Sequence, residues 1–141
     1  MIFDHLGREK TIRFIKKLKV MEIDISSISF DYAGAISLID QYCRKNQIHP
    51  RTNFRLQSVV EELCLQILMP KLEDPSIHVT ITYEQQKEKA EVIVVYPGTF
   101  RPEDTDNTLA YTLLEANTES IEYKPDPDGT NSMVHIVLSS V

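Results

Sequence analysis

The strongest constraint on the fold lies near the middle of this 141-residue chain, where two strand-like segments follow each other closely. From Ile77 to Tyr83 every second residue is apolar and the residues between them are polar, the pattern of a strand with one buried face. A polar connection over residues 84–89 leads to residues 91–96, which are apolar on both faces and therefore typical of a central strand. The sequence thus predicts a β-hairpin in the middle of a sheet.

Helical periodicity and further alternation surround this hairpin. The predicted helices cover residues 8–20, 33–46, 51–69 and 108–117. The other predicted strands cover residues 22–30, 120–124 and 132–139. Pro70 ends the third helix, and His49 before Pro50 separates it from the second because a residue that precedes proline disfavours helical geometry. This order predicts an α+β fold, a two-layer α/β sandwich with helices packed on one face of a mixed, mostly antiparallel sheet.

The net charge of −6 is unevenly distributed along the chain. Residues 1–20 carry six Lys/Arg and two Asp/Glu, a charge of +4, whereas residues 21–141 carry nine and nineteen, a charge of −10. The acidic body argues against nucleic acid as a partner, because phosphate binding requires a basic surface. We expect residues 1–20 to be a basic amphipathic helix, an accessory element or a linker, and residues 21–141 to form the domain. The basic face is either solvated or a contact for anionic lipid or an acidic partner.

Several classes of protein are not indicated. No apolar run approaches the roughly 20 residues of a membrane-spanning helix, and the N-terminus lacks a signal-peptide pattern, so we expect a cytoplasmic protein without membrane contact. Cys43 and Cys64 fall on the apolar faces of predicted helices and form no Cys-x-x-Cys pair, which predicts core thiols. The four histidines show no metal-ligand spacing.

One edge of the predicted helix 51–69 carries a candidate site. Glu62 and Gln66 lie four residues apart at the same edge of the apolar stripe, whereas Glu61 lies beyond its opposite edge. A carboxylate followed by a carboxamide one turn later suits a polarised water or a metal–phosphate complex. The same pattern is also typical of the solvated edge of an amphipathic helix.

Two further landmarks follow this helix. The central strand ends in Tyr96-Pro-Gly-Thr-Phe-Arg-Pro102, and the stretch from Asp104 to Leu114 contains no glycine. A short helix, the strand-like Ile121-Glu-Tyr123 and the turn Gly129-Thr-Asn131 complete the chain. The order and spacing of these landmarks over residues 21–141 resemble the histidine-kinase-like ATPases (the GHKL or Bergerat fold), and most closely the bacterial anti-sigma-factor serine kinases.

The resemblance assigns roles to five residues. In that family the helix carries a glutamate, the proposed base, and an asparagine four residues later that binds Mg²⁺; Glu62 and Gln66 stand at these positions. The strand end carries Asp-x-Gly, in which the aspartate recognises the adenine amino group and the glycine lets the base approach the backbone. Here Tyr96 replaces the aspartate, while Gly98 and a following Phe100 are approximately kept. The family also places a Gly-x-Gly type turn before a helix, where backbone amides meet the phosphates, and that turn is lost here.

The resemblance with its missing residues implies a non-catalytic regulatory or protein-binding domain in which ATP binding is lost or weakened. Gln66, Tyr96, Gly98 and Phe100 would then form a vestigial nucleotide cleft. The implied partner is a protein: a sigma factor, an anti-sigma antagonist or a neighbouring ATPase domain of a larger protein, with a homodimer as one assembly. The alternative is an active serine/threonine kinase or ATPase with divergent motifs that binds ATP and Mg²⁺ and uses Glu62 as its catalytic base. A third class is a membrane-surface or assembly protein that acts through residues 1–20.

Overall fold

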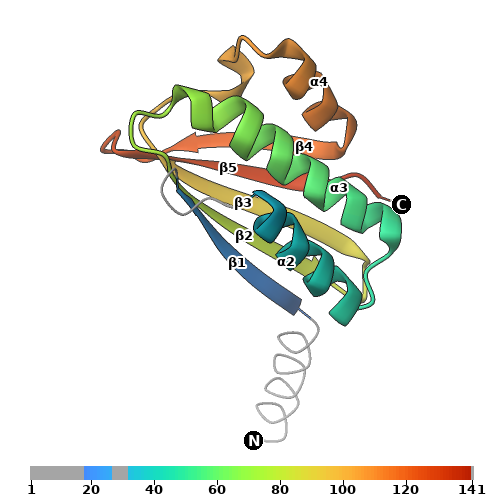
Figure 1. The fold of residues 1–141 in the computed structure, drawn as a ribbon. Helices are drawn as coiled ribbons and strands as arrows, with labels where there is room; N and C mark the ends of the chain where they lie inside the picture. Colours follow the sequence, from blue (N-terminus) through green and yellow to red (C-terminus); the bar gives the residue numbers. More distant parts are fainter. Residues whose placement is uncertain (1–17, 27–31, 141) are drawn as a thin grey trace, which may run out of the picture.

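The computed structural model describes residues 18–26 and 32–140. Its strands are β1 (Leu18–Ser26), β2 (Ser76–Glu84), β3 (Lys89–Pro97), β4 (Thr118–Pro125) and β5 (Asn131–Leu138). Its α-helices are α2 (Tyr32–Lys45), α3 (Pro50–Val60) and α4 (Thr108–Ala116). A π-helical segment (Glu61–Leu68) and a 3₁₀ turn (Met69–Lys71) continue α3, and a second 3₁₀ turn (Pro102–Asp104) precedes α4. Figure 1 shows α3 lying between α2 and α4 on one side of the sheet.

The five strands form one open sheet in the order β1-β2-β3-β5-β4. All four neighbouring pairs are antiparallel, so the part of the chain that the structure describes contains no parallel pair and the expectation of a mixed sheet is wrong there. The predicted α+β sandwich with helices on one face is confirmed. β3 is the central strand, as its apolar residues on both faces predict.

The core lies between the sheet and the helices. Alternate residues of β2, from Ile77 to Tyr83, are buried beneath the helices, as are Val92, Val94 and Tyr96 of β3. Cys43 of α2 and Cys64 of the π-helical segment are fully buried and unpaired. The prediction of two core thiols is therefore confirmed.

The first strand begins earlier than the sequence predicts. Residues 18–20 pair with residues 82–84 of β2, so the predicted helix 8–20 is wrong at its C-terminal end. Leu18 continues a helical spacing of apolar residues, but the pairing of residues 18–20 with β2 holds the backbone extended, with Leu18 on the opposite face of the strand from Ile23 and Ile25. Residues 8–17 of the predicted helix and residues 27–30 of the predicted strand lie outside the described residues.

The predicted helix 51–69 is divided into segments of different winding. Its start is fixed by Pro50 at the first helical position and by His49, whose Nδ1 accepts the N–H of Arg51 at 3.0 Å. Beyond Val60 the winding widens, and the N–H of Met69 bonds to the carbonyl of Cys64, five residues earlier. The buried residues of this segment are Leu63, Cys64, Ile67 and Leu68. The pair Leu63–Cys64 and the pair four residues later, Ile67–Leu68, thus both face the core in the wider winding.

Candidate functional site

The five residues singled out by the sequence occupy two elements and the turn that follows the second. Glu62 and Gln66 lie on the π-helical segment, Tyr96 lies near the end of β3, and Gly98 and Phe100 lie in the turn that follows. Gly98 and Phe100 line a cavity of about 390 Å³ together with residues 71–74. Glu62 and Gln66 line neither this cavity nor the smaller one that Arg101 and its neighbours form. The turn after β3 therefore shares a cavity with residues 71–74, at the end of the long helix, and not with the Glu62–Gln66 pair.

Tyr96 is a core residue whose hydroxyl closes the turn after β3. Its side chain is 1% exposed, and its hydroxyl donates a hydrogen bond of 2.6 Å to the carbonyl oxygen of Phe100. Burial, reinforced by the nearby phenol of Tyr123, raises the pKa of Tyr96, so the hydroxyl stays protonated and remains a donor. Tyr96 thus bonds to the backbone of its own chain.

Gly98 gives the turn its shape. Its φ of +87° lies in the region that glycine adopts without strain. Its N–H donates to the carbonyl of Thr130 at 2.8 Å, and its carbonyl accepts from the hydroxyl of Ser132 at 2.7 Å. Both backbone polar groups of the residue that would lie against an adenine in the family are already bonded to the β4–β5 hairpin.

Tyr123 and Ser132 fasten the same turn from the sheet. The hydroxyl of Tyr123 lies 3.0 Å from the carbonyl oxygen of Thr99 and 2.8 Å from the hydroxyl oxygen of Ser132. The sequence interpretation gave neither residue a role in the site. The available signal was Ser132, a polar residue at an inward position of β5, where Val134, Ile136 and Leu138 alternate with outward residues.

A second, smaller cavity lies beside this turn. It measures about 120 Å³ and is lined on one side by Arg101 and Glu103 and on the other by Tyr111 and Tyr123. The guanidinium of Arg101 lies 5.0 Å from the centre of the Tyr123 ring and also forms an ion pair of 2.8 Å with Glu103. The guanidinium of Arg101 therefore already has partners in Glu103 and the Tyr123 ring.

The loop before α4 is attached to the end of the long helix. The ammonium of Lys71 bonds to a carboxylate oxygen of Asp106 at 2.8 Å, and this contact holds the pKa of Asp106 below its usual range. The bond joins the 3₁₀ turn after the π-helical segment to the loop before α4, where the resemblance would place a phosphate turn. Both charges are exposed, so the bond orients the loop more than it stabilises the fold.

The start of α4 is occupied by its own cap. The side chain of Asn107 accepts the N–H of Ala110 at 3.1 Å, and its carbonyl accepts the N–H of Tyr111 at 3.2 Å. The N–H of Asn107 donates in turn to the hydroxyl of Thr105 at 3.1 Å. These bonds engage amides that a phosphate at this helix end would need.

Glu62 is half-buried and Gln66 is exposed, both on the π-helical segment. Burial raises the pKa of Glu62, and the carboxylate of Glu61 adds to the increase. Among residues 18–26 and 32–140, the carboxylate of Glu62 has neither a hydrogen-bond partner nor an ion-pair partner. π-Helical turns are rare, and those that occur are frequently found at functional sites. The π-helical winding is therefore the feature of this segment that favours a functional role for Glu62.

The described residues do not fit ATP and Mg²⁺ in the manner of the family. The hydroxyl of Tyr96 donates to the carbonyl of Phe100, and the amides of Gly98, Asn107 and Ala110 donate within the chain. No group of three or more His, Cys, Asp or Glu side chains within the described ranges could hold a metal ion. We derive no chemical step through either group.

Comparison of the sequence with models of protein families and with curated proteins finds no match. Within the described part of the chain, no helix has both the length and the apolar character needed to cross a membrane. The interpretation of the site consequently depends on its geometry and on the resemblance of the sequence.

Proposed function

We propose that this chain is a regulatory, protein-binding domain on a histidine-kinase-like ATPase fold in which the nucleotide cleft is closed. The observation that carries the proposal is the 2.6 Å hydrogen bond from the buried hydroxyl of Tyr96 to the carbonyl of Phe100. Tyr96 stands at the position that would recognise adenine, and opening the turn for a ligand would leave its buried hydroxyl without an acceptor. Such a loss typically costs about 1–3 kcal/mol.

The second argument comes from the phosphate side. The stretch before α4 has no glycine, carries Asp104 and Asp106, and caps α4 with its own Asn107. Carboxylates next to a triphosphate repel it, and an engaged helix start offers it fewer amides. Both ends of a nucleotide would thus meet groups that oppose its binding.

A protein-binding role has support on the helical layer. Leu109 and Leu113 lie one turn apart on the same face of α4 and are 69% and 42% exposed, and Phe54 of α3 is 65% exposed. Neighbouring exposed apolar side chains are typical of contact surfaces, and the Leu109–Leu113 pair is the feature that supports this role. The partner class is the one that the resemblance implies: a sigma factor, an anti-sigma antagonist or an adjoining ATPase domain.

The experiment that tests the proposal is calorimetric titration of the chain with ATP and with ADP, each in the presence and absence of Mg²⁺. We expect no Mg²⁺-dependent heat and no Mg²⁺-dependent rise in melting temperature at millimolar nucleotide. Micromolar, Mg²⁺-dependent binding would contradict a closed cleft. A Leu109→Ser, Leu113→Ser double variant, which leaves Ala110 and Leu114 in the core, is the matching test once a candidate partner protein is in hand.

A second candidate function is an active ATP-dependent serine/threonine kinase or ATPase. The specific observation in its favour is Glu62, which lacks a partner in the described structure, has a raised pKa and lies on a π-helical segment. In that case Glu62 is the base and Gln66 the Mg²⁺ ligand. Loss of Mg²⁺-dependent ATP binding in both Glu62→Ala and Gln66→Ala would support these roles, and undiminished binding in both would remove them.

A further inference from the structure

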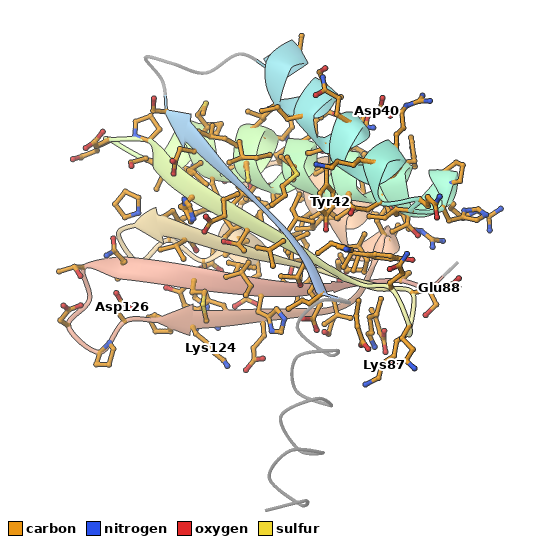
Figure 2. All side chains as sticks on the ribbon, turned by 90° about the horizontal axis from the view of Figure 1, so that it is seen from below. Asp40, Tyr42, Lys87, Glu88, Lys124 and Asp126 are labelled. Atoms are coloured by element: carbon orange, nitrogen blue, oxygen red, sulfur yellow. The ribbon has the colours of Figure 1, made fainter. Side chains whose placement is uncertain are left out.

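A larger cavity lies at the other end of β3 from the turn at Gly98. It measures about 600 Å³, within the range of roughly 300–1,000 Å³ that is usual for small-molecule pockets. It lies between the start of α3 and the β2–β3 hairpin. Figure 2 shows Glu88 of this hairpin at the opposite end of the sheet from Asp126 of the β4–β5 hairpin. The five residues of the predicted nucleotide site do not line it.

The start of α3 offers an unused backbone donor to this cavity. Pro50 has no N–H, and the N–H of Arg51 donates to His49. The N–H of Thr52 has no acceptor among the described residues, as is usual in the first turn of a helix. The positive end of the helix dipole lies at the same place, because α3 and the π-helical segment run on together from Pro50 to Leu68.

Two largely buried residues present unpartnered hydroxyl groups to this cavity. Thr52 is 4% exposed and Tyr83 is 5% exposed, and both line the cavity. Neither hydroxyl has a hydrogen-bond partner in the described part of the chain. Both hydroxyl oxygens are therefore open to the cavity, where each can bond to water or to an acceptor group of an entering molecule.

Two further donors surround the same space. The Nδ1 of His49 accepts the N–H of Arg51, so the neutral ring carries its proton on Nε2 and can donate from there. Arg44 donates from Nε to Asp40 at 2.8 Å, and its two terminal nitrogens have no partner within the described ranges. Arg44 and His49 both line the cavity and are exposed, so an entering molecule can reach them.

One lining group opposes an anion. Glu88, at a positive φ of +51° in the hairpin, brings a carboxylate to the rim of the cavity. Ile48 and the ring of Pro50 supply an apolar part of the lining. The lining therefore has hydrogen-bond donors at the start of α3, an apolar surface, and a single carboxylate on the hairpin.

We propose that this cavity binds a small organic anion through a phosphate or carboxylate group, held by the N–H and hydroxyl of Thr52, the hydroxyl of Tyr83 and the guanidinium of Arg44. The apolar lining receives the remainder of the molecule. The site is independent of the closed nucleotide cleft, and a failure of either proposal leaves the other intact.

The test follows the amide resonances of the chain by NMR while inorganic phosphate or acetate is added at constant ionic strength, with chloride as the balancing anion. We expect one of the two anions to shift the Thr52 amide in a saturable way that chloride does not reproduce. The anion that binds more tightly identifies the group. Saturation by neither phosphate nor acetate at millimolar concentration would overturn the proposal.

Variants separate this site from general charge effects. Arg44→Gln should weaken binding at least about tenfold, as expected for the loss of a hydrogen bond to a charged group. Glu88→Gln should strengthen it by roughly two- to fivefold, because a like charge at the rim is removed. Arg51→Gln, at the same helix start but outside the lining, is the matched control and should leave the affinity unchanged. Equal weakening by Arg44→Gln and Arg51→Gln would contradict the site.

Two conservative variants test the hydroxyl groups while keeping the shape of the cavity. Thr52→Val and Tyr83→Phe should each weaken binding severalfold without changing the dispersion of the NMR spectrum. Unchanged affinity in both would show that the buried hydroxyls take no part, and would overturn the assignment. The Arg44→Gln chain also serves as a control in the nucleotide titrations, because a phosphate of ATP could enter this cavity.

Discussion

The hydroxyl of Tyr96 and the carbonyl oxygen of Phe100 lie 2.6 Å apart, and this hydrogen bond closes the turn that follows the central strand. The bond is partly buried and joins two residues that the family resemblance places at a vestigial nucleotide cleft. Tyr96 therefore has a structural role, which is to hold the turn after β3 in place.

Tyr96→Phe should therefore lower the free energy of unfolding by about 1–2 kcal/mol, because the ring stays packed while the Phe100 carbonyl loses its donor. Urea unfolding at neutral pH measures the change. Tyr111→Phe is the control, because the Tyr111 hydroxyl has no hydrogen bond within the described structure. Equal losses in the two variants would show that the Tyr96 bond contributes nothing specific.

Ser132 and Tyr123 should act together on stability. Ser132→Ala removes a fully buried hydroxyl that bonds to the Gly98 carbonyl, and should lower the free energy of unfolding by about 1–3 kcal/mol. In a double-mutant cycle with Tyr123→Phe the coupling should reach about 0.5 kcal/mol or more, since the two hydroxyls are in contact. Ser120→Ala on exposed β4 is the control. A coupling of zero would mean that the two residues hold the turn independently.

His78 should titrate above the ordinary histidine value of about 6.5. Its Nδ1 lies 2.6 Å from Asp24 and its Nε2 lies 3.2 Å from Glu22, and these contacts raise the pKa of His78, the one with Asp24 most. Since the folded pKa exceeds the unfolded one, the stabilising contribution is complete below the unfolded pKa and disappears as pH rises through the folded pKa.

Imidazole NMR titration measures this pKa directly. Asp24→Asn should lower the pKa of His78 more than Glu22→Gln does, because the Asp24 contact is shorter. The matching stability measurement compares His78→Gln with the native chain across the same pH range. A His78 pKa at or below the ordinary value would contradict the expectation.

Glu62 should reduce the stability of the domain when it is ionised. Because burial raises the pKa of Glu62, the folded state is favoured while the carboxyl is protonated, and this advantage is lost as pH rises through the folded pKa. Glu62→Gln should therefore melt at a higher temperature than the native chain at neutral pH, and at a similar temperature at acid pH. Glu73→Gln, in an exposed position, is the control. A lower melting temperature for Glu62→Gln at neutral pH would overturn the prediction.

The two thiols should resist modification in the folded chain. Burial raises the pKa of both Cys43 and Cys64 to about 12, and both side chains are fully buried. The thiolate is the reactive form, so a disulfide reagent should react with neither thiol under native conditions and with both after unfolding. A Ser120→Cys variant supplies an exposed thiol as the positive control. Rapid modification of either native cysteine would show that the helical layer opens locally.

Much of the fold can be predicted from the periodicity of apolar residues alone. The alternation of residues 76–84 gives the bounds of β2, and the helix start at Pro50 and the helix over 108–116 agree with the predictions to within about one residue. The start of β1 is not predicted, because the spacing of Leu18 suits both a helix and a strand and the choice depends on β2, which lies far away in the sequence. The spacing of apolar residues also does not predict the π-helical winding after Val60.

Only some residues of the candidate site are indicated by the sequence. Periodicity placed Glu62 and Gln66 at one edge of a helix, and the resemblance directed attention to Tyr96 and Gly98. The contacts that close the turn involve Thr130 and Ser132, more than thirty residues further along the chain, and only the pairing of β3 with β5 brings them there. The cavity at Thr52 and Tyr83 likewise depends on a helix start and a hairpin that meet only in the folded chain.

The turn after β3 has a consequence for any molecule that contacts this end of the sheet. Its Gly98, Thr99 and Phe100 carbonyls are already bonded within the chain, so folding alone completes its shape. A partner would meet a surface with little conformational entropy left to lose, and recognition there would require almost no rearrangement of this domain. The same rigidity suits the turn to recognition by a partner and makes it unsuited to a conformational change on binding.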